Sequence, residues 1–154
     1  MAFDGITIAA MVRELHLNLD GGRFNKIAQP EADELLITGK GANGQCRLLL
    51  SASASLPLIY FTSKNKPSPM TAPNFCMLLR KHIGSARVSD IKQPGLERVV
   101  EFELEHLNEL GDPCKKVLIM ELMGKHSNII FCDDKNMILD SIKHVSSHMS
   151  SVRE

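Results

Sequence analysis

The sequence predicts an α+β domain in which antiparallel strands predominate and two helices accompany them. Short runs with alternating or continuous apolar character recur along the chain, separated by turns rich in Gly, Pro and Asn. Only two segments have apolar residues at helical spacing. A chain of 154 residues, 44% of them hydrophobic, fits one globular domain with a core of its own.

The two predicted helices cover residues 5–19 and 73–83. Asp4 can cap the first helix and Gly21-Gly22 can end it. Its expected buried face holds Ile8, Met11, Val12, Leu15 and Leu19. The expected buried face of the second helix holds Phe75, Leu78, Leu79 and Ile83. We expect the first helix to pack on its own core; a partner helix is the alternative.

The predicted strands form one group before the second helix and another after it. They cover residues 23–29, 34–40, 45–52 and 58–62, then 86–92, 97–107, 117–123, 128–133 and 137–143. Gly39, Gly41 and Gly44 satisfy the dinucleotide-binding pattern G-x-G-x-x-G. That pattern requires a strand before it and a helix after it, whereas here strand follows strand. We therefore interpret this stretch as a hairpin.

Residues 117–123 are apolar on both alternating faces except for Glu121, which is typical of a strand buried on both sides. Residues 97–107 alternate between acidic and apolar side chains, so the acidic set should face water. The same alternation puts Arg98 at the edge of the inward face, where its charge needs a partner. An Arg98–Glu121 ion pair would account for both charges without any function. A binding site is the alternative.

Arg80, Lys81 and His82 cluster in the last turn of the second predicted helix. Cations there interact favourably with the helix dipole, which is sufficient to explain the cluster. A phosphate-facing basic spot explains it equally well. Both interpretations stay open from the sequence.

Composition narrows the classes of function. Lys plus Arg equals Asp plus Glu at 18 each, so any basic surface must be local. Cys46, Cys76, Cys114 and Cys132 form no C-x-x-C pair, which favours reduced thiols in a cytosolic protein. The start of the chain does not resemble a signal peptide, and no run is long enough to cross a membrane. No zinc-ligand spacing, Walker A motif or nucleophile elbow is present, so we predict no metal, cofactor or catalytic site.

Several segments resemble one family in order along the whole chain. They are A-F-D-G-I-T-I-A-A-M-V-R-E-L, G-G-R-F-N-K-I-A-Q-P, N-F-C-M-L-L-R-K-H-I, Q-P-G-L-E-R-V-V, E-L-M-G-K-H-S-N-I-I and I-L-D-S-I-K-H-V. They resemble the NFACT-N domain of the RqcH/NEMF family, whose bacterial members are also called FbpA, fibronectin-binding protein A. The resemblance covers residues 1–154 as a single NFACT-N domain, and implies that the chain is the N-terminal part of a longer multidomain protein.

The resemblance also implies a mostly antiparallel β-sandwich with two flanking helices, similar to the N-terminal domain of the MutM/Nei DNA glycosylases. Those enzymes use an N-terminal proline and a following glutamate, where this chain has Ala2 and Phe3. We therefore expect no base-excision activity and no enzyme. Family members bind the large ribosomal subunit with its stalled nascent chain and recruit tRNA, alanine-charged in bacteria, for C-terminal tailing. The implied location is cytoplasmic and ribosome-associated, away from membranes.

Two family motifs are tied to tRNA handling. An Asp-Arg pair is matched by Glu97 and Arg98, where the longer carboxylate keeps the charge, and Glu-x-Met-Gly is matched by residues 121–124. Arg98 can act as a bidentate donor to RNA. The expected nucleic-acid-binding residues are Glu97, Arg98, Glu121, Leu122, Met123, Gly124, Lys125, His126, Ser127, Asn128, Arg80 and Lys81. The alternative function is an adhesin-like surface protein that binds fibronectin.

Overall fold

The computed structural model describes residues 5–19, 21–41, 44–53, 58–62, 73–95, 98–107, 110–122, 127–135 and 137–143. Two helices and nine strands lie within these ranges. They are α1 (Gly5–Leu19), β1 (Arg23–Ala28), β2 (Glu34–Gly41), β3 (Gly44–Ser51), β4 (Leu58–Thr62), α2 (Asn74–Ile83), β5 (Arg87–Lys92), β6 (Val99–Leu107), β7 (Pro113–Glu121), β8 (Asn128–Asp133) and β9 (Ile138–Ser141). The predicted α+β class and the order of its elements are confirmed, while the predicted cap at Asp4 lies outside the described residues.

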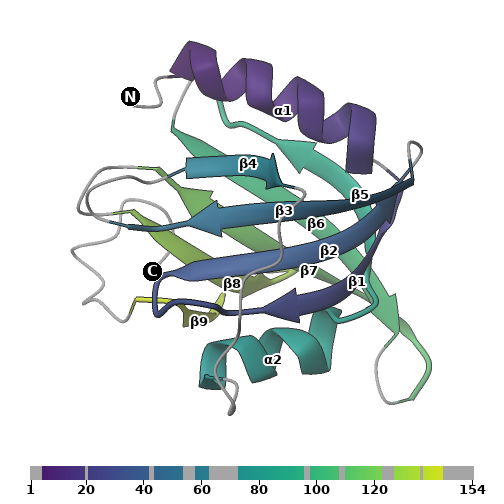
Figure 1. The fold of residues 1–154 in the computed structure, drawn as a ribbon. Coiled ribbons are helices and arrows are strands. Elements are labelled where there is room, and N and C mark those ends of the chain that lie inside the picture. The colour runs from purple at the N-terminus through teal and green to yellow at the C-terminus, as the bar shows by residue number, and fades with distance from the viewer. Residues whose placement is uncertain are drawn as a thin grey trace.

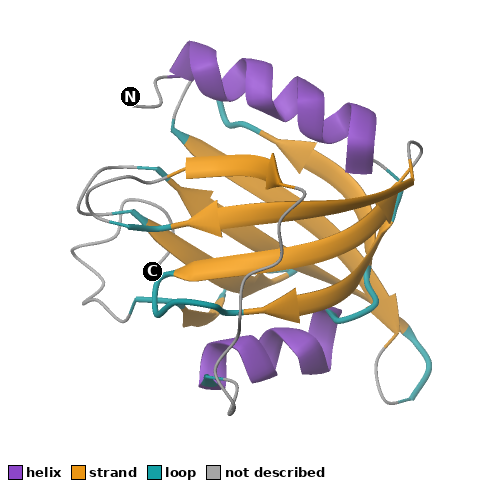
Figure 2. Cartoon of the chain, in the orientation of Figure 1, coloured by secondary structure: helices purple, strands orange, loops and turns teal. Residues whose placement is uncertain are grey.

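The nine strands form one antiparallel sheet in the order β4-β3-β2-β1-β5-β6-β7-β8-β9. Figure 1 shows this sheet folded over, with β1–β4 in front of β5–β9. The expected sandwich is therefore one bent sheet rather than two separate ones. The helices lie on opposite sides of it, α1 at the top of the view and α2 at the bottom (Figure 2).

The sheet turns at the junction of β1 and β5, which we call the seam. Only one pair of residues, Arg23 and Arg87, is in register across it. The register shifts between Phe24 and Lys26 on β1 and between Val88 and Asp90 on β5. Such bulges bend a strand and increase its twist. Two bulges next to a single pairing explain how one sheet makes two layers.

The main core fills the space between the layers and includes buried side chains from both helices. Phe24 of β1, Phe102 of β6 and Phe131 of β8 are its largest fully buried members. β7 is buried on both faces, as its apolar run predicts. Leu118 and Met120 enter the main core, whereas Ile119 packs in a second cluster with Val99, Ile130 and Cys132. The outer face of β6 is therefore apolar at Val99 and turns acidic only further along the strand.

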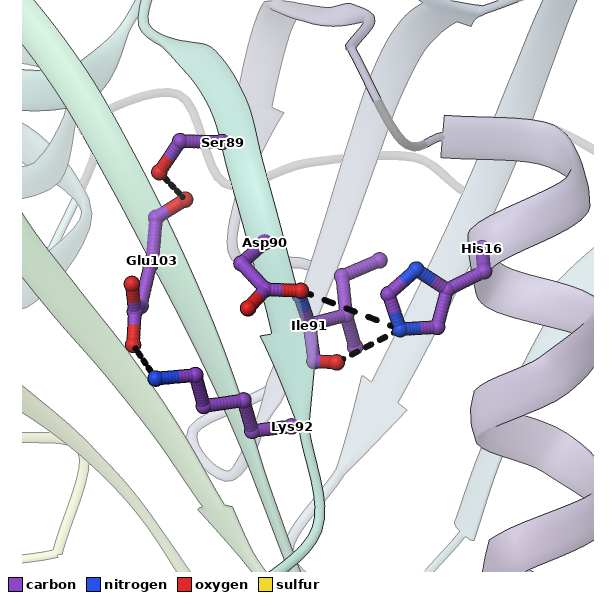
Figure 3. Close-up of polar contacts among 6 residues, drawn as sticks. All are labelled: His16, Ser89, Asp90, Ile91, Lys92 and Glu103. Atoms are coloured by element: carbon purple, nitrogen blue, oxygen red, sulfur yellow. Dashed lines mark hydrogen bonds and ion pairs between the residues drawn. The ribbon is translucent and has the colours of Figure 1, made fainter.

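The predicted buried face of α1 is confirmed, because Ile8, Leu15 and Leu19 are buried in the core. A polar contact also ties this helix to β5 (Figure 3). His16 Nε2 lies 2.7 Å from the carbonyl oxygen of Ile91 and 3.9 Å from Oδ1 of Asp90. Within the described ranges, neither helix is long and apolar enough to span a membrane.

Figure 3 also shows how β5 is held to β6 beside its bulge. The Ser89 hydroxyl donates to the Glu103 carbonyl at 3.0 Å. Lys92 Nζ lies 2.7 Å from Oε2 of Glu103. Both contacts therefore join β5 to β6 through the single residue Glu103, close to the bulge between Val88 and Asp90.

Glycines let β2 pass close to the end of α1. A Cβ built on Gly41 would lie 1.7 Å from the backbone oxygen of Asn18, and one on Gly22 would lie 2.3 Å from that of Lys40. Gly41 pairs with Gly44 across the β2–β3 hairpin. The predicted hairpin is thus confirmed, and its glycine at position 41 serves close backbone packing.

We predict that Gly41→Ala destabilises the domain by about 2 kcal/mol or more, because backbone atoms must move to admit the methyl group. Chemical denaturation of the two proteins measures the difference. Gln45→Ala is the control, because Gln45 is exposed on the neighbouring strand β3 and its replacement should cost less than about 0.5 kcal/mol. An unchanged denaturation midpoint for Gly41→Ala would contradict the close packing described above.

Candidate nucleic-acid interface

A groove of about 1150 Å³ runs along the seam between β1, β5, the end of β6 and the last turn of α2. Its charged lining comes from four elements that are distant in sequence. The cations are Arg23, Lys26, Arg80, Lys81 and Arg87, and the carboxylate is Glu105. With five cations against one carboxylate, the lining carries a formal charge of +4 in a chain whose net charge is zero. The basic surface is therefore local, as the composition requires.

Three of these side chains are held by the protein itself. Arg80 Nε donates to the carbonyl oxygen of Ile27 at 2.7 Å, which ties α2 to β1. Arg23 Nη1 donates to the carbonyl oxygen of Ser85 at 3.2 Å. Arg87 forms an ion pair with Glu105. Since a guanidinium has five N–H donors, each arginine keeps donors for a ligand after these contacts.

Two histidines close one side of the groove. The ring of His82 packs edge-on against the ring of His106, with centroids 6.2 Å apart. Partial burial and the nearby Lys116 ammonium lower the pKa of His106 below its ordinary value. Lys116 Nζ lies 3.3 Å from Nε2 of that ring, where it can donate to a neutral imidazole. His106 thus adds no charge to the groove at neutral pH.

The groove bears on the two interpretations of the basic cluster at the end of α2. The helix dipole accounts for cations in the last turn, where Arg80 and Lys81 lie. It does not account for Arg23 and Lys26 of β1 or Arg87 of β5, which line the same groove. A concentration of positive charge from several elements is typical of a surface that binds an anion.

The second candidate region is the end of β7 with the start of β8. Glu121 is only 2% exposed and lies opposite Val99 on one side and Asn128 on the other. Arg98 comes just before β6, and its carbonyl oxygen accepts a hydrogen bond from the Leu122 N–H at 2.9 Å. The Arg98 side chain is exposed.

Our prediction that Arg98 sits at the inward face as a charge in need of a partner is therefore wrong. β6 begins one residue later, so the alternation that buries Val100 and Phe102 does not extend to Arg98. Water can solvate this guanidinium without any ion pair. The Arg98–Glu121 pair stays a prediction, and Arg98 remains available to a ligand.

The remaining predicted site residues divide into three sets. Leu122 is buried in the main core, and Ser127 and Asn128 are buried beside Glu121. The Asn128 side chain donates to the Lys143 carbonyl at 3.0 Å and accepts from the Lys143 N–H at 3.0 Å. Asn128 therefore fixes the backbone of this region. Glu97, Met123, Gly124, Lys125 and His126 lie outside the described residues.

Sequence analysis missed Arg23, Lys26 and Arg87. The outward positions of Arg23 and Arg87 were readable, since both are exposed as the alternation suggests, whereas Lys26 is exposed because of the bulge on β1. Their proximity was not, because it depends on β1 pairing with β5 across 64 positions of sequence. No local sequence pattern predicts the pairing of β1 with β5.

Other kinds of site find no support in the described residues. They contain no group of three or more His, Cys, Asp or Glu side chains that could hold a metal ion. All four cysteines are free thiols, as predicted. Burial raises the pKa of Cys46 and of Cys76, so both thiols stay protonated at neutral pH and are poor nucleophiles.

Comparison with known families gives a match over almost the whole chain. Residues 4–154 match the family of NFACT N-terminal and middle domains. The chain belongs to this family.

Relatives in the NFACT family include proteins named as ribosome quality control factors. The Rqc2 homolog RqcH of Bacillus subtilis is 42% identical over 99% of this chain, which spans 27% of that relative. The human ribosome quality control complex subunit NEMF is 28% identical over 98% of the chain, which spans 13% of that relative. The chain thus spans about a quarter or less of these two relatives.

Solved NFACT-family structures share the fold. The N-terminal domain of the fibronectin-binding protein PavA of Streptococcus pneumoniae is similar with a TM-score of 0.91 and 38% identity, over 94% of this chain and 55% of that one. The N-terminal part of the fibronectin/fibrinogen-binding protein of Streptococcus suis has a TM-score of 0.93 and 36% identity, over 99% and 58%. The bent sheet with two helices is therefore a family fold.

We predict that Asn128→Ala lowers the free energy of unfolding by about 1–3 kcal/mol, because it removes the hydrogen bonds of the buried Asn128 side chain to the Lys143 N–H and carbonyl and to the Ile129 N–H. Denaturant titration measures the loss. Asp134→Ala, an exposed change in the following turn, should cost less than about 0.5 kcal/mol. Equal losses for the two variants would contradict a structural role for Asn128.

Proposed function

We propose that this chain is the RNA-binding module of a ribosome-associated quality-control factor. In this proposal it belongs to a longer cytoplasmic protein that binds the large ribosomal subunit carrying a stalled nascent chain. The module helps to recruit tRNA, alanine-charged in bacteria, for tailing of that chain. The observation that carries the proposal is the exposed Arg98, whose backbone is bonded to Leu122 beside the buried Glu121, in a family with members named for ribosome quality control.

The proposed division of roles follows the geometry. Arg98 is exposed and offers a planar pair of donors to a phosphate or a base edge. Its backbone is anchored to Leu122 at the end of β7. Glu121 and Asn128, buried beside this anchor, hold the region in shape. Glu97, Met123, Gly124, Lys125 and His126 are further residues that we propose to contact tRNA, the buried Ser127 supports the region from inside, and Arg80 and Lys81 contact phosphates.

A second candidate function is binding of fibronectin at the cell surface. It is favoured by the names of the similar streptococcal proteins, which are described as fibronectin-binding and fibronectin/fibrinogen-binding. Cell fractionation separates the candidates. Co-sedimentation with the large ribosomal subunit supports the first function, and labelling of intact cells by an impermeant reagent supports the second.

We predict that Arg98→Ala weakens tRNA binding by about tenfold, the effect of losing roughly 1.4 kcal/mol of contact energy. The melting temperature should not change, because the Arg98 side chain is exposed. A binding titration and a thermal melt of the full-length protein measure the two quantities.

Arg13→Ala provides the matched control, since Arg13 is exposed on α1, on the other side of the molecule from α2. That variant should bind tRNA as the wild type does. Unchanged tRNA binding by Arg98→Ala would remove Arg98 from the site. A collapsed melt would make Arg98 a structural residue.

A further inference from the structure

We propose that the seam of the sheet is a track for the phosphodiester backbone of RNA, separate from the Arg98 region. This inference rests on the proposed RNA-binding function and adds to it a second contact surface. The track consists of the seam arginines Arg23 and Arg87, their neighbours Lys40 and Lys26, and Arg80 and Lys81 of α2.

A row of charged side chains crosses the sheet at the seam. Residues that are opposite one another on neighbouring strands share a face of the sheet. The register places them in the order Lys40 (β2), Arg23 (β1), Arg87 (β5), Glu105 (β6) and Lys115 (β7). Five strands at about 4.8 Å spacing make a row about 19 Å long. The four cations of this row are exposed.

The seam pair itself carries an electrostatic cost. Arg23 and Arg87 are flanked by the Phe24 N–H to Ala86 oxygen bond of 2.9 Å and the Val88 N–H to Gly22 oxygen bond of 2.7 Å. They therefore form a non-hydrogen-bonded antiparallel pair, the geometry in which cross-strand side chains stand closest. Like charges directly opposite each other destabilise a sheet. The one carboxylate in the row, Glu105, pairs with Arg87 and leaves Arg23 between Arg87 and Lys40.

A bound polyanion would relieve this repulsion. The Arg23 guanidinium is already directed by its bond to the Ser85 carbonyl, and Arg80 by its bond to the Ile27 carbonyl. Both keep unused donors facing an open groove, so little side-chain freedom remains to be lost on binding. These cations repel each other in the free protein and are already positioned to bind an anion. Anion binding therefore explains their arrangement better than a role in folding does.

The shape of the groove favours a polymer as the ligand. Its volume of about 1150 Å³ exceeds the usual range for small-molecule pockets, roughly 300–1000 Å³. Its cations are spread along β1, β5 and α2 rather than converging on one point. Its described lining contains no Phe, Tyr or Trp on which bases could stack. Contacts of this kind recognise a phosphate backbone without reading sequence.

The track and the Arg98 region lie at opposite ends of β6. Glu105, beside Arg87, is six residues from Val99, a separation of about 20 Å along a strand. A small ligand cannot bridge that distance, whereas a folded RNA can. Binding at both ends would fix the orientation of an RNA on the domain.

The test is Arg23→Gln in the full-length protein, with binding of tRNA and of an unrelated RNA duplex measured over a range of salt concentrations. We expect several-fold weaker binding of both RNAs. The slope of log affinity against log salt should fall by about 0.7–0.9, the change expected for one lost phosphate contact. The melting temperature should stay the same or rise, because one of two opposed charges is removed.

Two variants serve as controls. Arg23→Lys keeps the charge and should retain the salt slope. Arg13→Gln removes one exposed arginine from α1, which contributes no residue to the lining of the groove, and should leave binding and slope unchanged. The double change Lys26→Gln with Lys81→Gln, which alters no side chain with a hydrogen bond described above, should reduce the slope by about twice as much as Arg23→Gln.

Three outcomes are informative. Unchanged RNA binding by the Arg23 and Lys26/Lys81 variants, with Arg98→Ala still defective, would overturn the track and leave the proposed function standing. A lowered melting temperature with unchanged RNA binding would also overturn the track, because Arg23 would then be a structural residue that holds the Ser85 carbonyl. Duplex binding that depends on the track, in a protein with no affinity for tRNA, would support the track and refute the proposed function.

Discussion

The structure depends on the seam between β1 and β5. One sheet of nine strands becomes a two-layered domain because it turns where a single pair, Arg23 and Arg87, is in register. Bulges on both strands supply the bend. Phe24 and Val88, next to the pair, enter the main core and hold the layers together. The seam therefore fixes both the shape of the core and the direction of the charges on its outside.

Those charges explain how a neutral chain can present a basic surface. Arg23 of β1, Arg87 of β5 and Arg80 of α2 are distributed along the sequence, and folding brings them to one groove. The seam arginines face each other, which is unfavourable for an empty sheet and favourable for one that holds an anion. A functional site that costs stability in the absence of its ligand is common in proteins.

Much of the fold could be predicted from the sequence, because its signals are local. The α1 face was recognisable from helical spacing, and the burial of β7 on both sides from its apolar run. The hairpin at Gly41 and Gly44 was recognisable from turn chemistry. The predicted strands differ from the observed ones by a few residues, most at β7, which starts at Pro113 instead of residue 117.

The candidate site was less predictable, for two physical reasons. Sequence analysis placed Arg98 inward because it extended the alternation of β6 one residue before the strand begins. The alternation itself does not show at which residue a strand begins. The groove required knowing that β1 lies beside β5, a non-local pairing that follows from packing the whole core. Only Arg80 and Lys81 of the groove were found, since their clustering at a helix end is visible locally.

Chemical footprinting of lysines tests the central claim most directly. The full-length protein would be labelled with an amine-reactive reagent, free and bound to tRNA, and the reactivity of each lysine compared by mass spectrometry. The account predicts that bound tRNA protects Lys26, Lys40 and Lys81, which belong to the proposed track, and spares Lys135 in the β8–β9 turn. Equal labelling of these three lysines in the free and the tRNA-bound protein would contradict the proposed track.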